Sequence, residues 1–105
     1  MDIEASGSGW SGSAAANHAW LVEAINQASS MIGSSRVGIY SSAYGWSVAM
    51  GGYADLTHFP LWYAHYDGSA SFSDFSSFGG WGSPAMKQFQ GDATVCGFGV
   101  DLNWW

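Results

Sequence analysis

The chain has 105 residues, enough for one domain, and a net charge of −6 from two basic and eight acidic residues. This balance argues against nucleic acid as a partner, because neutralising phosphates requires clustered Lys and Arg. No apolar run approaches the about 20 residues that cross a bilayer, which argues against a membrane-spanning segment.

Aromatic residues are abundant in this short chain, with seven Trp, five Tyr and six Phe. An apolar content of 48% predicts a folded globular chain rather than a disordered one. The aromatics indicate either a Trp-rich core or a groove that stacks sugar rings. Composition alone favours the core.

The first half of the chain alternates strand and helix patterns. Residues 1–5 indicate a short strand, and a Ser- and Gly-rich loop that carries Trp10 follows it. Helical spacing of apolar residues predicts a helix over 14–32, with Ser13 as its N-cap and Gly33 as its stop. The pattern then predicts a strand, a short helix interrupted by a glycine, and three more strands, at 36–41, 43–50, 61–66, 86–90 and 98–103.

Residues 67–83 form a Ser-, Gly- and Phe-rich segment between two of these strands. Phe72, Phe75 and Phe78 recur every third residue, which predicts a loop packed by its own aromatic rings. Three aspartates next to Gly or Ser are interpreted as turn residues: Asp67, Asp74 and Asp92.

The order of elements indicates an α/β fold. Strands separated by helices pair in parallel through right-handed crossovers, whereas the last three strands have no helix between them. The pattern therefore begins as a β/α barrel and ends without its helices. We expect an open, curved sheet of five strands with helix 14–32 on its convex side.

One face of the predicted strands is polar. Side chains alternate along a strand, and one alternating set is acidic, amide or aromatic, whereas the other is mostly aliphatic or Phe. The polar set contains Asp2, Glu4, Tyr40, Trp62, Tyr66, Gln88 and Asp101. Because a parallel sheet under helices is normally apolar on both faces, the polar face indicates a site inside the curve of the sheet.

Asp2 and Glu4 are the candidate catalytic pair. Two residues apart on a strand, they lie about 6.6 Å apart along it, side by side on one face. One carboxyl can then raise the pKa of the other, and a protonated acid beside an ionised one is what glycosidic cleavage requires. Asp-x-Glu alone is weak evidence; the aromatic face and Asp101 strengthen it. The alternative is a solvated, frayed terminal segment.

The ordered motifs resemble the family 25 glycoside hydrolases, which are lysozymes (N-acetylmuramidases). The motifs are Asp2-Ile3-Glu4, Val37-Gly38-Ile39-Tyr40-Ser41, Pro60-Leu61-Trp62-Tyr63-Ala64-His65-Tyr66, Lys87-Gln88-Phe89 and Val100-Asp101-Leu102-Asn103. The resemblance covers the whole chain. It implies an irregular barrel of five β/α units followed by three bare strands, of which residues 1–105 form a single incomplete domain, the C-terminal half.

The resemblance also implies roles for individual residues. Glu4 matches the catalytic acid, Asp2 its companion and Asp101 the acid on the last strand. The sugar groove would be lined by Tyr40, Trp62, Tyr66 and Gln88. Apart from the resemblance, Trp10 on its Gly- and Ser-rich loop either reaches over this groove or staples the loop. The implied reaction, without a cofactor, is hydrolysis of the β-1,4 bond between N-acetylmuramic acid and N-acetylglucosamine in bacterial peptidoglycan. A non-catalytic carbohydrate-binding fragment and an inactive gene fragment are the alternatives.

The departures from the family pattern set further expectations. The first three β/α units and a further active-site Asp are not in this sequence, so we expect marginal stability, little lysis and self-association through an exposed sheet edge. The full-length protein would be secreted or lysosomal/phagosomal, although this chain carries no signal peptide. Cys96 is either half of a disulfide in the complete protein or a buried thiol.

A metal site is a further possibility that the sequence raises and does not favour. His58 and His65 lie seven residues apart, near Asp55 and Asp67. This spacing fits no compact ligand motif, so we expect no metal.

Overall fold

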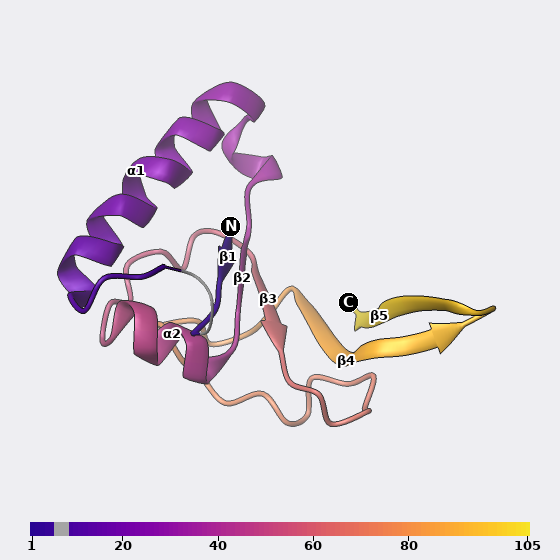
Figure 1. The fold of residues 1–105 in the computed structure, drawn as a ribbon. Coiled ribbons are helices and arrows are strands. Elements are labelled where there is room, and N and C mark those ends of the chain that lie inside the picture. Colours follow the sequence, from indigo (N-terminus) through magenta and orange to yellow (C-terminus); the bar gives the residue numbers. More distant parts are fainter. Residues whose placement is uncertain (6–8) are drawn as a thin grey trace.

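The computed structural model describes residues 1–5 and 9–105. It contains a five-stranded sheet in the order β1-β2-β3-β4-β5 (Figure 1). The strands are β1 (Asp2–Ile3), β2 (Ile39–Ser41), β3 (Leu61–Ala64), β4 (Met86–Val95) and β5 (Phe98–Trp104). The first four strands are parallel, and β5 is antiparallel to β4. The fold is thus mixed α/β, and the predicted parallel pairing is confirmed.

Two helices form where the sequence predicts them. Helix α1 (Ala14–Ile32) begins at Ser13, whose side chain accepts a hydrogen bond from the Ala16 N–H, and it ends at Gly33. Helix α2 (Ala43–Met50) is capped in the same way by Ser42. Capping side chains satisfy backbone donors that a helix leaves unpaired in its first turn.

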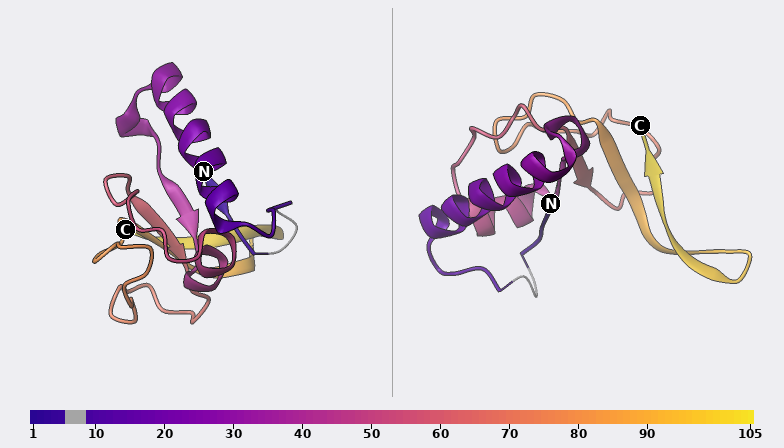
Figure 2. Two further views of the ribbon diagram at one scale, coloured as in Figure 1. Left: turned by 90° about the vertical axis from the view of Figure 1, so that its left-hand side faces the viewer. Right: turned by 90° about the horizontal axis from the view of Figure 1, so that it is seen from above.

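The core lies between the helices and one face of the sheet. Both helices cover the same side, whereas the β4–β5 hairpin projects away from the body (Figures 1 and 2). The side chains that meet there are buried, and they include Ile3, Ile39 and Leu61 from the sheet, Leu21 and Ile25 from α1, and Trp46 and Met50 from α2. These sheet residues belong to the apolar alternating set, so the opposite, polar set faces away from the helices.

Several strand boundaries differ from the predicted ones. β1 has two residues rather than five, and β2 begins at Ile39 because Ser34–Arg36 form a 3-10 helix, η1. β3 ends at Ala64. β4 continues to Val95 and forms a long hairpin with β5. Register shifts beyond Gln88 disturb the period-two pattern there, which is why alternation predicts too short a strand.

The segment after β3 is packed down by its aromatic rings, as predicted. Phe75 lies edge-on to Tyr63 with ring centroids 5.0 Å apart, and Phe78 contacts both Phe75 and Trp81 at 6.0 Å. The Trp81 indole donates to the Phe59 carbonyl and its ring contacts Trp46 in the core. This loop is therefore an integral part of the helix-side core.

Two further features bear on the expectations above. Among the described residues, no helix combines the length and apolar character that crossing a membrane requires. Cys96 is exposed at the turn between β4 and β5, so the interpretation of it as a buried thiol is wrong.

Candidate active site

An open cleft of about 650 Å³ lies on the polar face of the sheet. It is lined by seven of the eight predicted site residues: Asp2, Glu4, Tyr40, Trp62, Tyr66, Gln88 and Asp101. The strand register explains the convergence, because Asp2 pairs with Tyr40 and Tyr40 pairs with Trp62, which puts their side chains in one row across the sheet. The structure thus brings the three candidate acids into one aromatic-walled cleft.

A hydrogen-bond network centred on Gln88 forms one wall of the cleft. The hydroxyls of Tyr40 and Tyr66 donate to Gln88 Oε1 at 2.5 and 2.7 Å. With two donors on Oε1, the amide nitrogen faces Asp101 and donates to its Oδ2 at 2.9 Å. The backbone N–H of Asp92 donates to the other oxygen, Asp101 Oδ1, at 3.0 Å. Both oxygens of Asp101 therefore accept hydrogen bonds, which is the arrangement of an ionised carboxylate.

Tyr40 is held as a proton donor in this network. Burial raises the pKa of its hydroxyl well above the usual range, and the hydrogen bond with Tyr66 and the nearby charges of Glu4 and Asp2 raise it further. Its ring stands edge-on to Trp62, with centroids 4.9 Å apart. The Trp62 indole donates to Asn103 Oδ1 at 2.9 Å, so the orientation of this ring is fixed as well.

The backbone around Glu4 is held from three sides. The buried Ser41 hydroxyl donates to the Ile3 carbonyl at 2.7 Å, and the Trp10 indole donates to the Glu4 carbonyl at 3.0 Å. On the third side α2 approaches so closely that a Cβ on Gly45 would lie 3.0 Å from the Ile3 oxygen and 3.3 Å from the Glu4 Cα. These contacts fix the position from which the Glu4 side chain projects.

Of the two positions considered for Trp10, the structure shows the staple and not the one over the groove. Trp10 does not line the cleft. Its ring packs edge-on against Trp20 of α1, with centroids 5.6 Å apart, while its indole N–H reaches the Glu4 carbonyl. Trp10 therefore connects α1 with the end of β1, and it contacts the backbone of Glu4 rather than the groove.

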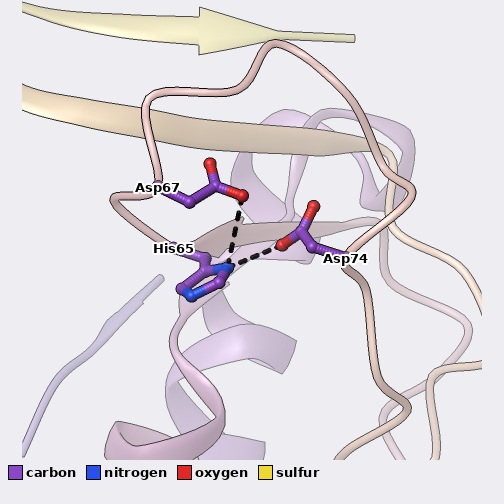
Figure 3. A group of neighbouring side chains, drawn as sticks. All are labelled: His65, Asp67 and Asp74. Atoms are coloured by element: carbon purple, nitrogen blue, oxygen red, sulfur yellow. Dashed lines mark hydrogen bonds and ion pairs between the residues drawn. The ribbon is translucent and has the colours of Figure 1, made fainter.

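A second polar cluster lies on the helix side of the sheet (Figure 3). His65 Nδ1 lies 2.6 Å from Asp74 Oδ2 and 3.7 Å from Asp67 Oδ2. Their ligand-type atoms all lie within 4.8 Å of one another, a spacing that could hold a metal ion. However, the fully buried ammonium of Lys87 donates to Asp67 at 2.8 Å and to Asp74 at 2.7 Å. The positive charge of Lys87 would repel a divalent cation. The carboxylates are therefore better suited to binding the buried lysine ammonium than to binding a metal.

The ionisation of this cluster follows from its contacts. Burial alone would raise the pKa of Asp74, but hydrogen bonds from Lys87, His65 and Tyr63 hold it well below its usual range. The Lys87 hydrogen bond likewise lowers the pKa of Asp67. Burial opposes the charged form of Lys87, yet its two carboxylate partners raise its pKa. Burial and the hydrogen bond to Asp74 raise the pKa of Tyr63 to about 12.

Sequence reasoning missed this cluster because it assigned Asp67 and Asp74 to turns. A signal was present: Lys87 lies on the otherwise apolar face of its strand, and a buried ammonium needs carboxylate partners. Of the residues considered as metal ligands, His65 and Asp67 come together, whereas His58 packs on Phe59 and Asp55 pairs with His18.

Comparison with known proteins assigns the family. The family model described as Lysozyme-like protein 1 matches residues 1–89. The chain belongs to the lysozyme-like family. The resemblance to family 25 lysozymes is confirmed by relatives in Dictyostelium discoideum. "Probable GH family 25 lysozyme 4" is 46% identical over 105 residues, which are 100% of this chain and 47% of the relative. "Probable GH family 25 lysozyme 2" is 55% identical over 69 residues, covering 66% and 32% of the two chains.

A solved structure extends the comparison to the fold. The muramidase from Acremonium alcalophilum superimposes with a TM-score of 0.76 at 25% identity, covering 99% of this chain and 48% of the muramidase. The lysozyme-like chain therefore spans about half the length of the proteins that it matches.

Proposed function

We propose that this lysozyme-like chain carries the acid-bearing half of a muramidase. Its reaction would be hydrolysis of the β-1,4 bond between N-acetylmuramic acid and N-acetylglucosamine in bacterial peptidoglycan. The observation that carries the proposal is the convergence of Asp2, Glu4 and Asp101 on one aromatic-walled cleft. The names of the relatives as lysozymes and of the structural match as a muramidase support it.

Hydrogen bonding supports a division of roles among the acids. Asp101 accepts hydrogen bonds on both oxygens, so it is poorly arranged to give up a proton. Glu4, whose backbone is held on three sides, is the proposed general acid that protonates the leaving oxygen. Asp2 would remain ionised and stabilise the cationic transition state. The attacking group is then either Asp2 or the acetamido oxygen of the substrate.

We further propose that residues 1–105 form one half of a β/α barrel. The other half would correspond to the part of the relatives that this chain does not match. Two features support this: β1 is an edge strand of two residues, and the polar face of the sheet carries an open cleft. An unpaired edge and an uncovered face favour association, so residues 1–105 alone should self-associate. A secreted or lysosomal/phagosomal location of the complete protein would bring it to peptidoglycan.

The test joins residues 1–105 to the part of "Probable GH family 25 lysozyme 4" that they do not match, since they cover 47% of that relative. Glu4→Gln should lower the rate of lysis of purified cell walls by at least roughly 10²-fold, the lower end of general-acid contributions. Glu23→Gln is the matched control, because Glu23 is the other glutamate of the chain and is exposed on α1. Near-full lysis by the Glu4→Gln protein would overturn the assignment.

The second candidate is a carbohydrate-binding fragment without catalysis. The open cleft favours it, because Tyr40, Trp62 and Tyr66 of this chain all line it. In that case residues 1–105 should bind short chitin oligosaccharides with a dissociation constant on the order of millimolar, worth roughly 4 kcal/mol, and should not lyse cell walls.

A further inference from the structure

The β4–β5 hairpin contains a bulge opposite Asp101. Residues 91–92 of β4 stand opposite this single residue of β5. The flanking pairs that fix the register are Gln90 with Leu102 and Ala93 with Val100. An extra residue of this kind interrupts the ladder, and it can turn a backbone group or a side chain in a new direction, often beside an active site.

Asp92 adopts a backbone conformation that few side chains favour. Its φ is 54°, in the left-handed region, and Cys96 with φ 52° is the other non-glycine residue of the described chain that shares it. Cys96 has a local reason, because it forms the two-residue hairpin turn with Gly97, and such turns favour a positive φ at both positions. Asp92 lies within β4, where the chain does not reverse. Strained backbone of this kind is often retained where it serves a site.

The bulge contacts both ends of the Gln88 network. At one end, the Asp92 N–H donates to Asp101 Oδ1 at 3.0 Å, while Gln88 holds the other oxygen. At the other end, a Cβ on Gly91 would lie 3.3 Å from the Tyr66 ring, so the glycine leaves room for this ring against the strand. The same Tyr66 donates its hydroxyl to Gln88 Oε1.

Asp101 needs such support because of its place in the fold. It is exposed, and it lies on the hairpin that projects away from the body of the protein (Figure 1). Gln88 alone would leave the carboxylate with one of these two donors and free to turn about that bond. A second donor from the backbone fixes the plane of the carboxylate and favours its ionised form.

We propose that the bulge at Gly91 and Asp92 is a positioning element of the cleft, in which the left-handed Asp92 presents a fixed backbone donor that holds Asp101 ionised and turned toward Gln88. The effect of this element on cleavage rests on the proposed function. Because the contact uses the backbone N–H, residue 92 acts through its φ and not through its carboxylate.

The first test measures amide hydrogen exchange by NMR in residues 1–105. Asp101→Ala removes the acceptor, so the N–H of residue 92 should exchange about tenfold faster, as expected when one hydrogen bond to a charged group is lost. Asp92→Gly and Asp92→Val both remove the carboxylate, but only glycine adopts a positive φ freely. The N–H should therefore stay protected in Asp92→Gly and exchange about tenfold faster in Asp92→Val.

Cys96→Val is the matched control. It places the same β-branched side chain at nearly the same φ in the same hairpin, away from Asp101. It should therefore report the general cost of loosening the hairpin, and it should leave the exchange of residue 92 unchanged. Equal exchange at residue 92 in Cys96→Val and Asp92→Val would show a loosened hairpin and overturn the proposal, as would an unchanged rate in Asp101→Ala.

The second test measures cleavage of soluble peptidoglycan fragments by the fusion protein that tests the proposed function. Asp92→Val should lower kcat about tenfold with KM nearly unchanged, because the position of Asp101 matters in the transition state, and Asp92→Gly should restore kcat. An active fusion in which Asp92→Val equals Asp92→Gly would overturn the positioning role alone. An inactive parent fusion would contradict the proposed function, while the exchange rates would still decide whether the bulge holds Asp101.

Discussion

Replacing Lys87 by Met should strongly destabilise the lysozyme-like chain. The Lys87 side chain is fully buried, and its ammonium donates to both oxygens of Asp67 and to Asp74. Methionine fills a similar volume but leaves two carboxylates facing each other without their cation. Asp74 would keep hydrogen bonds from Tyr63 and His65, and Asp67 would keep one from the backbone N–H of Ser69.

The magnitude follows from how much water can reach the stranded carboxylates. Removing one partner of a fully buried ion pair costs about 3–5 kcal/mol. Here the side chains of Asp67 and Asp74 retain 26% and 20% of their exposure, so water can solvate them partly after the change. We therefore expect a loss of roughly 2–3 kcal/mol in the free energy of unfolding, below the fully buried limit.

Urea denaturation followed by tryptophan fluorescence measures this loss. Arg36→Met is the matched control, because Arg36 is the other basic residue of the chain and is exposed, and it should change stability by less than about 0.5 kcal/mol. A second variant, Lys87→Met with Asp74→Asn, should recover part of the loss by removing one stranded charge. A Lys87→Met chain within about 1 kcal/mol of the parent would refute the idea that this cluster holds the loop to the sheet.

Further predictions concern the same cluster and the Glu4 backbone. The pKa values of Asp67 and Asp74 are lowered in the fold, so their contribution to stability is present above about pH 4, the unfolded range, and is lost as the pH falls through the folded values. Urea midpoints measured from pH 7 to pH 3 should therefore fall, and less steeply in Lys87→Met. Trp10→Phe keeps a ring against Trp20 but loses the donor to the Glu4 carbonyl, so thermal unfolding should report a loss of about 1 kcal/mol. Gly45→Ala should destabilise by about 1–3 kcal/mol although alanine favours helices, because its Cβ would press on the Ile3 carbonyl; increased stability would show that α2 can shift.

The sequence predicts those features that depend on residues close together in the chain, namely helix ends and the two faces of each strand. Helical spacing and two capping residues place α1 at residues 14–32, and α1 forms there. Strand alternation separates Ile39 and Leu61, which are buried under the helices, from Tyr40 and Trp62, which line the cleft. The faces can be read from the sequence because a period of two survives wherever a strand is regular.

The features that sequence failed to predict depend on contacts between distant segments. Lys87 contacts Asp67 and Asp74, which lie 20 and 13 residues before it in the sequence. The turn-like residues next to those aspartates give no sign that they bind a buried cation. Trp10 donates to the Glu4 carbonyl and packs against Trp20 of α1, a pair of contacts that a Gly- and Ser-rich sequence permits but does not specify. Register shifts in β4 likewise arise from pairing with β5.

The connections within the cleft indicate which properties this chain can have without the rest of its relatives' fold. The Gln88 network joins β2, β4 and β5 through Tyr40 and Asp101, and the Glu4 backbone is held by Trp10, Ser41 and Gly45. These partners lie within residues 1–105, so the Asp101 carboxylate and the Glu4 backbone are both held by contacts inside this chain. The other half would instead cover the open side of the cleft and exclude water, which strengthens electrostatic effects on a transition state. Under the proposed function, we therefore expect residues 1–105 to bind sugar and expect efficient cleavage to depend on the half that the relatives possess in addition.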